Sequence, residues 1–161
     1  MTVPADDPAA ARVAAAELAA LPDGGRRFRR WVELEAWVRS ALAEAWWEQT
    51  FPNAPVEVDV QRRSRGATFS AAHVVEDGSS AVIWIRSGSW DAVTVVHELA
   101  HVAARSGPGR GADPHGSEFV AALESLWRRH LGVQAWAALV QALEPREPDR
   151  QRDRRRSDPG R

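Results

Sequence analysis

The chain contains no cysteine, no lysine and no tyrosine among its 161 residues. Without cysteine there is no disulfide framework, no thiol nucleophile, no Cys-ligated zinc site and no iron–sulfur cluster. Without lysine the chain cannot form a Schiff base or a P-loop phosphate site. Without tyrosine no phenol can act as a catalytic hydrogen-bond donor. The side chains left for chemistry are five histidines, the carboxylates and the arginines.

The charge is balanced, and long apolar runs are also missing. All 21 basic residues are arginines, and 22 acids bring the net charge to −1. This balance does not favour a surface that binds nucleic acid over its whole area. The Ala-rich stretch 9–20 is interrupted by Arg12 and Glu17 and is too short to span a bilayer. Because the N-terminus is acidic where a signal peptide is basic, we expect a cytoplasmic protein without a membrane partner.

Composition along the chain predicts three segments. Residues 1–24 form an Ala-rich N-terminal arm or helix with little large apolar surface, which we expect to dock loosely. Residues 25–143 hold the periodic patterns of one folded domain. Residues 144–161 are rich in arginine, acids and proline, which is typical of a disordered tail.

The domain pattern predicts an α+β fold. Apolar residues recur at helical spacing over about 31–48, 90–105, 114–131 and 133–143. The second of these helices is expected to be buried, with Ser89 as its N-cap. Three short β patterns lie between the first two helices, at 56–62, 66–75 and 80–86. Turn residues at 65–66 and at 76–78 suggest hairpins. We therefore expect a small, mostly antiparallel three-stranded sheet packed on a central helix, with flanking helices.

Residues 97–101 read His-Glu-Leu-Ala-His, an H-E-x-x-H motif on the predicted buried helix. Residues i and i+4 lie on one helical face, so His97 and His101 can converge on one metal ion. Glu98 is rotated about 100° around the helix axis and suits a general base rather than a third ligand. The alternative is a pair of core histidines that are hydrogen-bonded to neighbouring groups.

A catalytic zinc site needs a third protein ligand, and His115 is the candidate. A glycine-rich loop separates it from His101, which allows the chain to return over the same helical face. Gly116 would let the next helix end approach the metal closely. Taken alone, His115 is typical of a helix N-terminus capped by Asp113; next to the H-E-x-x-H motif we interpret it as a ligand.

Two short motifs lie thirteen residues apart: His97-Glu98-Leu99-Ala100-His101 and His115-Gly116-x-x-Phe119. Together they resemble the H-E-x-x-H…H-G-x-x-F/W signature of zincin metallopeptidases of the SprT and WLM type. The arrangement is similar to a group of small zincin-type metallohydrolases. The resemblance covers residues 80–125 and, in outline, 31–130. It implies a zincin-like domain with one zinc ion per chain on His97, His101 and His115. It also implies a metallopeptidase for peptide or protein substrates, in which Glu98 is the general base on zinc-bound water.

Two departures from the family affect what can be expected. The chain lacks the Cys-rich zinc ribbon that helps SprT-type proteins bind DNA, and it lacks the tyrosine that many zincins use to stabilise the tetrahedral intermediate. Candidates for the missing hydrogen-bond donor are His73, Arg86 and Arg105. The alternation of apolar and polar residues over 66–75 predicts that His73 points inward. Glu118 or Asp113 would orient the ligand histidines, although capping of a helix explains both equally well.

Three further expectations complete the prediction. An extended peptide would pair with an edge strand, for which 66–75 is preferred to 80–86. His130 is expected at the surface near a helix end. Arginine clusters at 26–30, 62–65 and 154–156 leave a DNA-associated protease open as an alternative, although solvated turns explain them more simply. Another alternative is a structural or interaction module that binds metal without catalysis.

Overall fold

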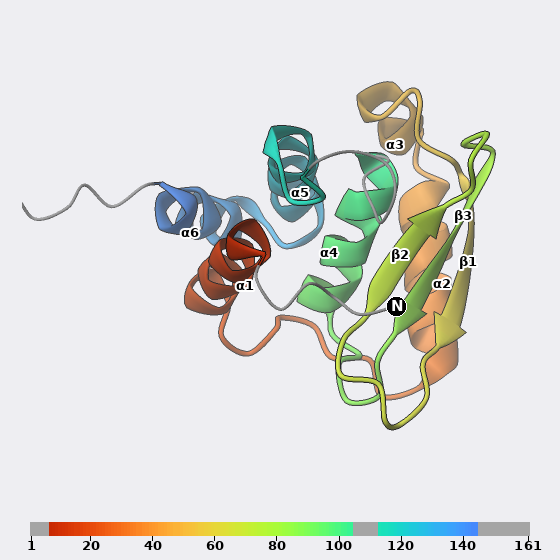
Figure 1. The fold of residues 1–161 in the computed structure, drawn as a ribbon, viewed down its shortest axis with the longest axis horizontal. Coiled ribbons are helices and arrows are strands. Elements are labelled where there is room, and N and C mark those ends of the chain that lie inside the picture. Colours follow the sequence, from red (N-terminus) through yellow and green to blue (C-terminus); the bar gives the residue numbers. More distant parts are fainter. Residues whose placement is uncertain (1–6, 105–112, 145–161) are drawn as a thin grey trace, which may run out of the picture.

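The computed structural model describes residues 7–104 and 113–144 of the chain (Figure 1). These residues form six helices and three strands: α1 (Pro8–Ala20), α2 (Trp31–Leu42), α3 (Ala45–Thr50), β1 (Glu57–Arg62), β2 (Ala71–Val74), β3 (Ser80–Ile85), α4 (Ala92–Ala103), α5 (Ser117–His130) and α6 (Val133–Leu143). The α+β prediction is confirmed. Within these residues no helix is long and apolar enough to cross a membrane. The predicted tail lies outside the described residues from position 145 onward.

The three strands form one mixed sheet in the order β1-β3-β2. β1 pairs with β3 in parallel along six residues, and β2 pairs with β3 antiparallel along four. The expectation of a mostly antiparallel sheet was therefore wrong: only the turn at 76–78 closes a hairpin, and the segment after β1 crosses to the far side of β3. The central position goes to β3, which carries the most buried apolar side chains, because a central strand has neighbours on both edges.

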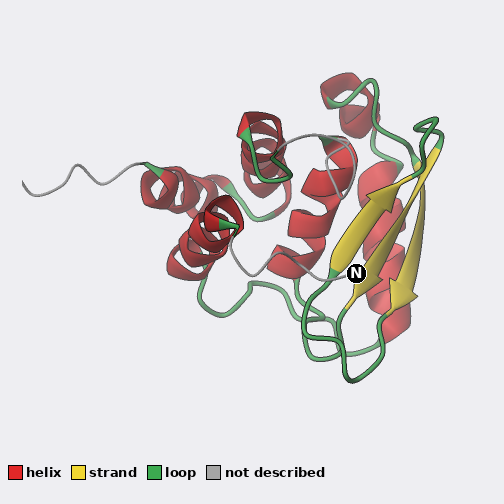
Figure 2. Cartoon of the chain, in the orientation of Figure 1, coloured by secondary structure: helices red, strands yellow, loops and turns green. Residues whose placement is uncertain are grey.

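One face of the sheet packs on the core. Ala81, Ile83 and Ile85 of β3 are buried, as are Ala72 and Val74 of β2, while their neighbours along each strand are more exposed. The helices cover this face, with α2 behind the sheet and α4 beside β2 (Figure 2). His73 was predicted to point inward, but it is exposed because β2 alternates in the opposite phase.

Helix α1 is an integral part of the fold. Val13 and Ala16 are buried in the main core, and the helix packs against α6. Asp7 caps its first turn, since one carboxylate oxygen accepts hydrogen bonds from the backbone N–H groups of Ala9 and Ala10 at 3.0 Å. The helix alternative of the N-terminal prediction is therefore present at Pro8–Ala20, but the expected loose docking was wrong, because alanines bury enough surface when a second helix packs closely on them.

The helix predicted over 31–48 is two helices. α2 ends at Leu42, and Glu44 has an extended backbone (ψ 132°) that starts α3 in a new direction. The Glu44 carboxylate accepts hydrogen bonds from the guanidinium of Arg129 on α5, at 2.6 and 2.9 Å. The break turns Trp47 fully into the core.

His130 was expected at the surface, but its ring lies against those of Trp37 and Trp46, at 5.4 and 5.7 Å between centroids.

Trp127 anchors α5 in the core, with no exposed surface. We expect Trp127→Ala to lower the free energy of unfolding by about 3–5 kcal/mol, because a large cavity replaces the indole. Urea denaturation followed by circular dichroism measures the loss. Trp136→Ala is the matched control, since that indole is only partly buried and packs under the Arg128 guanidinium. Equal losses in the two variants would contradict the assignment of Trp127 to the core.

Candidate metal centre

Helix α4 carries the H-E-x-x-H motif through the middle of the molecule. Its N-cap is Asp91, whose carboxylate accepts a hydrogen bond from the backbone N–H of Thr94 at 2.8 Å. The predicted cap, Ser89, instead accepts hydrogen bonds from the guanidinium of Arg86. Apolar residues on most sides bury the helix, as the pattern predicted. The two motif histidines are therefore held on a rigid element.

The three predicted ligand histidines come together. One ring nitrogen of each of His97, His101 and His115 lies within 4.8 Å of the other two. The ring centroids are 5.1 Å apart for the two histidines of α4, and His115 lies 5.5 Å from His97 and 4.8 Å from His101. This spacing suits three imidazoles around one cation, so the histidines could hold a metal ion.

A tight turn before α5 presents His115. Asp113 shapes this turn: its carboxylate accepts a hydrogen bond from the backbone N–H of His115 at 3.0 Å, and its carbonyl oxygen accepts one from Gly116 at 3.1 Å. A Cβ atom on Gly116 would lie 3.2 Å from the same carbonyl oxygen. Gly116 therefore permits the close turn at Asp113, and Asp113 positions the backbone of His115 rather than its ring.

Phe119 forms the base of the cluster. It is 1% exposed, and its ring centroid lies 4.4 Å from that of His101, 4.8 Å from His115 and 5.1 Å from His97. An apolar ring under three imidazoles excludes water from one side and restricts their rotation. The Phe119 of the sequence motif is thus a packing element of the site.

Helix α1 supplies two carboxylates to the ligand rings. The Nδ1 atom of His97 lies 3.0 Å from Oε2 of Glu17, and Nδ1 of His115 lies 3.0 Å from Oδ2 of Asp7. An Nδ1–H that donates to a carboxylate leaves Nε2 with a lone pair for a metal ion and fixes the orientation of the ring. Asp7 does this with one oxygen while the other caps α1.

Sequence reasoning missed both carboxylates and proposed Glu118 and Asp113 instead. Glu118 is exposed and makes no contact with a ligand ring among the described hydrogen bonds. Glu17 could have been found from the sequence, because it is the one acid in the Ala-rich helix α1. In the structure Glu17 is 7% exposed and lies on the same buried face as Val13. A carboxylate on the buried side of a helix requires a polar partner.

Burial and charge set opposite protonation tendencies in the cluster. Burial lowers the pKa of His97, but the carboxylates of Glu17 and Glu98 outweigh it and raise that pKa to about 8. Burial, with the charges of His97 and His115, holds the pKa of His101 far below its usual value. Burial and the charge of His97 also lower the pKa of His115, against the opposing carboxylates of Asp7 and Asp113. Without a metal, a proton therefore resides first on His97.

Glu98 is a buried carboxylate next to the histidines. It is 5% exposed, and its Oε2 atom is buried without a hydrogen-bond partner among the described residues. Burial raises the pKa of Glu98 to about 7, and the charge of Glu17 adds to this, while His97 and Arg63 oppose it. A buried carboxylate oxygen without a partner is costly unless a cation or a water molecule occupies the adjacent space.

The donor set fits a divalent metal. Three convergent imidazoles, two of them with their Nδ1 atoms engaged by carboxylates, are the ligand chemistry of zinc and similar ions. The carboxylates of Glu17, Asp7 and Glu98 bring negative charge around the cluster. A cation at this place would offset that charge.

Two further predicted site residues, His73 and Arg86, do not join the cluster. His73 lies on the exposed face of β2. Arg86 is engaged in the loops after β1 and β3, where its guanidinium donates to the carbonyl oxygen of Thr68 and to Ser89. Arg105 lies outside the described residues. No catalytic donor that could replace a tyrosine is therefore identified among these candidates.

Several arginines of the predicted basic clusters have local partners. Arg30 pairs with Glu33 at 2.8 Å, and Arg26 lies over the ring of Phe28. Arg62 lies over the rings of Trp31 and Trp90, and Arg63 donates to the carbonyl oxygen of Phe69. These contacts fit the simpler interpretation of solvated turns. Residues 154–156 lie outside the described residues.

Comparisons with protein-family models, with curated proteins and with solved structures give no match for this chain. The interpretation of the site therefore depends on its own geometry and chemistry.

The α1 carboxylates should control metal affinity. We expect Glu17→Gln and Asp7→Asn each to weaken zinc binding by about 10- to 100-fold, because the rings lose their negatively charged partners. Competition with a chromophoric zinc chelator measures the change. Glu48→Gln, an exposed acid on α3, is the control and should bind zinc like the wild type. Unchanged affinity in both α1 variants would contradict an orienting role.

Metal affinity should also depend on pH above the usual range of histidine. The sequence alone predicts zinc loss between about pH 6 and 5, from the ordinary pKa of imidazole. Because the pKa of His97 is raised to about 8, its proton competes with the metal at higher pH. We expect the apparent Kd to rise about tenfold per pH unit as pH falls below 8. Zinc titrations at pH 6.5, 7.5 and 8.5 test this; a constant Kd would contradict it.

Proposed function

We propose that the protein is a zinc-dependent hydrolase, and more specifically a metallopeptidase with a zincin-like centre. The observation that carries the proposal is the convergence of three histidine nitrogens within 4.8 Å, next in sequence to Glu98, whose buried Oε2 atom has no hydrogen-bond partner among the described residues. A metal site with only a structural role is normally closed by four protein ligands, whereas a catalytic site uses three and leaves a position open. The described residues that could together hold an ion number three, and all of them are histidines.

His97, His101 and His115 would hold the ion. Neutral imidazole ligands suit zinc, although three-histidine sites accept other divalent metals as well. When bound, the metal supplies Lewis acidity, which lowers the pKa of a water molecule and polarises a carbonyl group. This supply of positive charge would also substitute for the missing tyrosine, because neither His73 nor Arg86 reaches the cluster.

Glu98 would be the general base. Its Oε2 atom accepts a proton from the attacking water and then delivers it to the nitrogen of the leaving group. In the metal-free chain burial raises the pKa of Glu98 to about 7. The added charge of a divalent cation favours the ionised form, so Glu98 starts the reaction as a base.

The sheet offers a place for an extended substrate. β2 lies at an edge and packs against α4, while β3 has strands on both sides. Only an edge strand has backbone N–H and C=O groups free to pair with a peptide. This arrangement supports β2, and not β3, as the strand that binds the peptide backbone.

Metal analysis combined with a hydrolysis assay tests the proposed function. Purified chain should carry about one zinc by native mass spectrometry. It should lose both zinc and activity on a quenched-fluorescent peptide library when treated with a chelator, and regain both when zinc is added back. A chain that takes up no zinc would contradict the metal site. Stoichiometric zinc without hydrolysis of any peptide would instead favour the structural or interaction module.

A further inference from the structure

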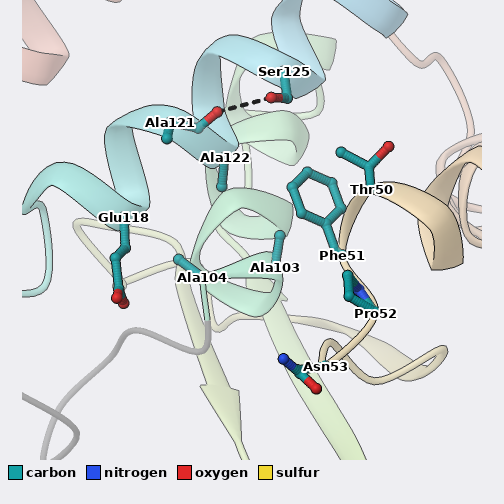
Figure 3. Close-up of a pocket in the computed structure, with 10 residues that line it drawn as sticks. All are labelled: Thr50, Phe51, Pro52, Asn53, Ala103, Ala104, Glu118, Ala121, Ala122 and Ser125. Carbon is teal, nitrogen blue, oxygen red and sulfur yellow. Dashed lines mark hydrogen bonds between the residues drawn. The ribbon is translucent and has the colours of Figure 1, made fainter.

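A cleft of about 510 Å³ lies where the C-terminal end of α4 meets α5 and the segment after α3 (Figure 3). A volume of this size accommodates part of a peptide or a small ligand. Its lining residues are Thr50, Phe51, Pro52, Asn53, Ala103, Ala104, Glu118, Ala121, Ala122 and Ser125. The three histidines and Glu98, the groups used above for hydrolysis, do not line this cleft.

The floor of the cleft is apolar and fixed. Alanines from α4 and α5 face each other across it, and their small side chains leave the space open. Phe51 forms the opposite wall, and its ring is held against those of Trp46 and Trp47, at 5.5 and 5.1 Å between centroids. The hydroxyl of Ser125 donates to the carbonyl oxygen of Ala121, so it does not offer a hydrogen to a ligand.

The cleft is contiguous with the metal centre along both helices. Ala104 follows His101 by three positions, so it lies one turn further along the same face of α4. Glu118, in the first turn of α5, follows His115 by three positions. A chain segment bound at the histidines would therefore reach the cleft within one or two residues.

Glu118 gives the cleft its charge. Figure 3 shows its side chain at one side of the opening, apart from Phe51 and Asn53 on the other side. It is exposed, and it forms no ion pair with another residue that the structure describes. The helix N-terminus and the turn at Asp113 do not use its carboxylate either. The cleft thus combines an apolar floor with one negative charge that no residue described by the structure pairs.

We propose that this cleft binds a cationic side chain, arginine or lysine, of a peptide substrate next to the bond that is cleaved. The methylene groups of such a side chain would lie on the alanines and Phe51, while its charged end pairs with Glu118. A neutral side chain of the same length gains only the apolar part of this contact, and an acidic one is repelled. The proposal rests on the proposed function for the identity of the ligand as a substrate.

Peptide binding to an inactive variant tests the cleft without hydrolysis. Zinc-loaded Glu98→Gln protein with ¹³C-labelled alanine methyl groups is titrated with acetyl-Ala-Arg-Ala-amide. Acetyl-Ala-citrulline-Ala-amide is the neutral probe of the same shape. We expect the arginine peptide to bind about three- to fivefold more tightly, as for a partly exposed ion pair. It should shift the methyl signals of Ala104 and Ala122.

Adding Glu118→Gln should remove the preference for arginine. Adding Glu124→Gln, an acid on the same helix outside the cleft, should keep it. Equal binding of the two peptides to Glu98→Gln, or methyl shifts confined to residues away from the cleft, would overturn the proposal. The preference can hold while the wild type hydrolyses nothing; that result would refute the proposed hydrolase and leave a cationic-peptide site. Hydrolysis that does not distinguish arginine from citrulline would refute the cleft alone.

Discussion

Glu98→Gln should bind one zinc per chain like the wild type and lose at least about 100-fold in kcat/KM on any peptide that the wild type cleaves. The amide keeps the size of the side chain but cannot accept a proton from water. The ligand set does not include Glu98, so metal affinity should change little. Zinc stoichiometry by mass spectrometry and initial hydrolysis rates, measured on the same preparation, separate the two effects.

The same substitution also has an expected effect on stability. Glu98 is buried with an unpartnered oxygen, and its pKa of about 7 means that the metal-free protein holds a costly carboxylate at neutral pH. Metal-free Glu98→Gln should therefore unfold at the same or a higher temperature than the wild type at pH 8. Glu48→Gln on α3 is the control for a simple loss of charge. Full activity in Glu98→Gln would exclude Glu98 as the base.

His101→Ala should abolish both metal binding and hydrolysis. His101 is 9% exposed, and its ring centroid lies within 5.1 Å of those of both partner histidines. Losing a direct ligand should weaken zinc binding by more than the effect of an orienting carboxylate, at least about 100-fold. Chelator competition gives the affinity, and the peptide assay gives the activity.

His73→Ala is the matched control for this loss. His73 is an exposed histidine on β2, outside the cluster, and its removal should leave zinc affinity unchanged. Circular dichroism of the metal-free variants shows whether each one is folded. A His101→Ala chain that is folded and still binds zinc like the wild type would refute the three-histidine site.

The sequence alone predicted those features of the fold and the site that depend on residues close together in the chain. His97 and His101 share a face because four positions make about one helical turn, and this holds wherever the helix packs. The buried character of α4 follows from its apolar residues, and the last helix runs over Val133–Leu143 as its periodicity predicted. His115 was identified from its motif, and the structure brings it to the other two histidines.

Tertiary packing decided the features that connect distant segments. The strand order β1-β3-β2 depends on which strand is most apolar once all three compete for the centre, so local turn residues could not predict it. At the break between α2 and α3, Glu44 pairs with Arg129, which is 85 positions away. The partners of the ligand rings, Glu17 and Asp7, lie 80 and 108 positions from their histidines.

The sequence by itself therefore determined that His97 and His101 could share one metal ion, because ligand spacing on a helix is a local property, whereas the approach of His115 depends on tertiary packing. Only the tertiary structure decided what orients those ligands and which charges surround them. An Ala-rich helix with weak local signals became part of the site because its one buried acid, Glu17, and its capping acid, Asp7, both met a histidine ring. Burial and charge at such contacts depend on distances in space, which no local pattern specifies.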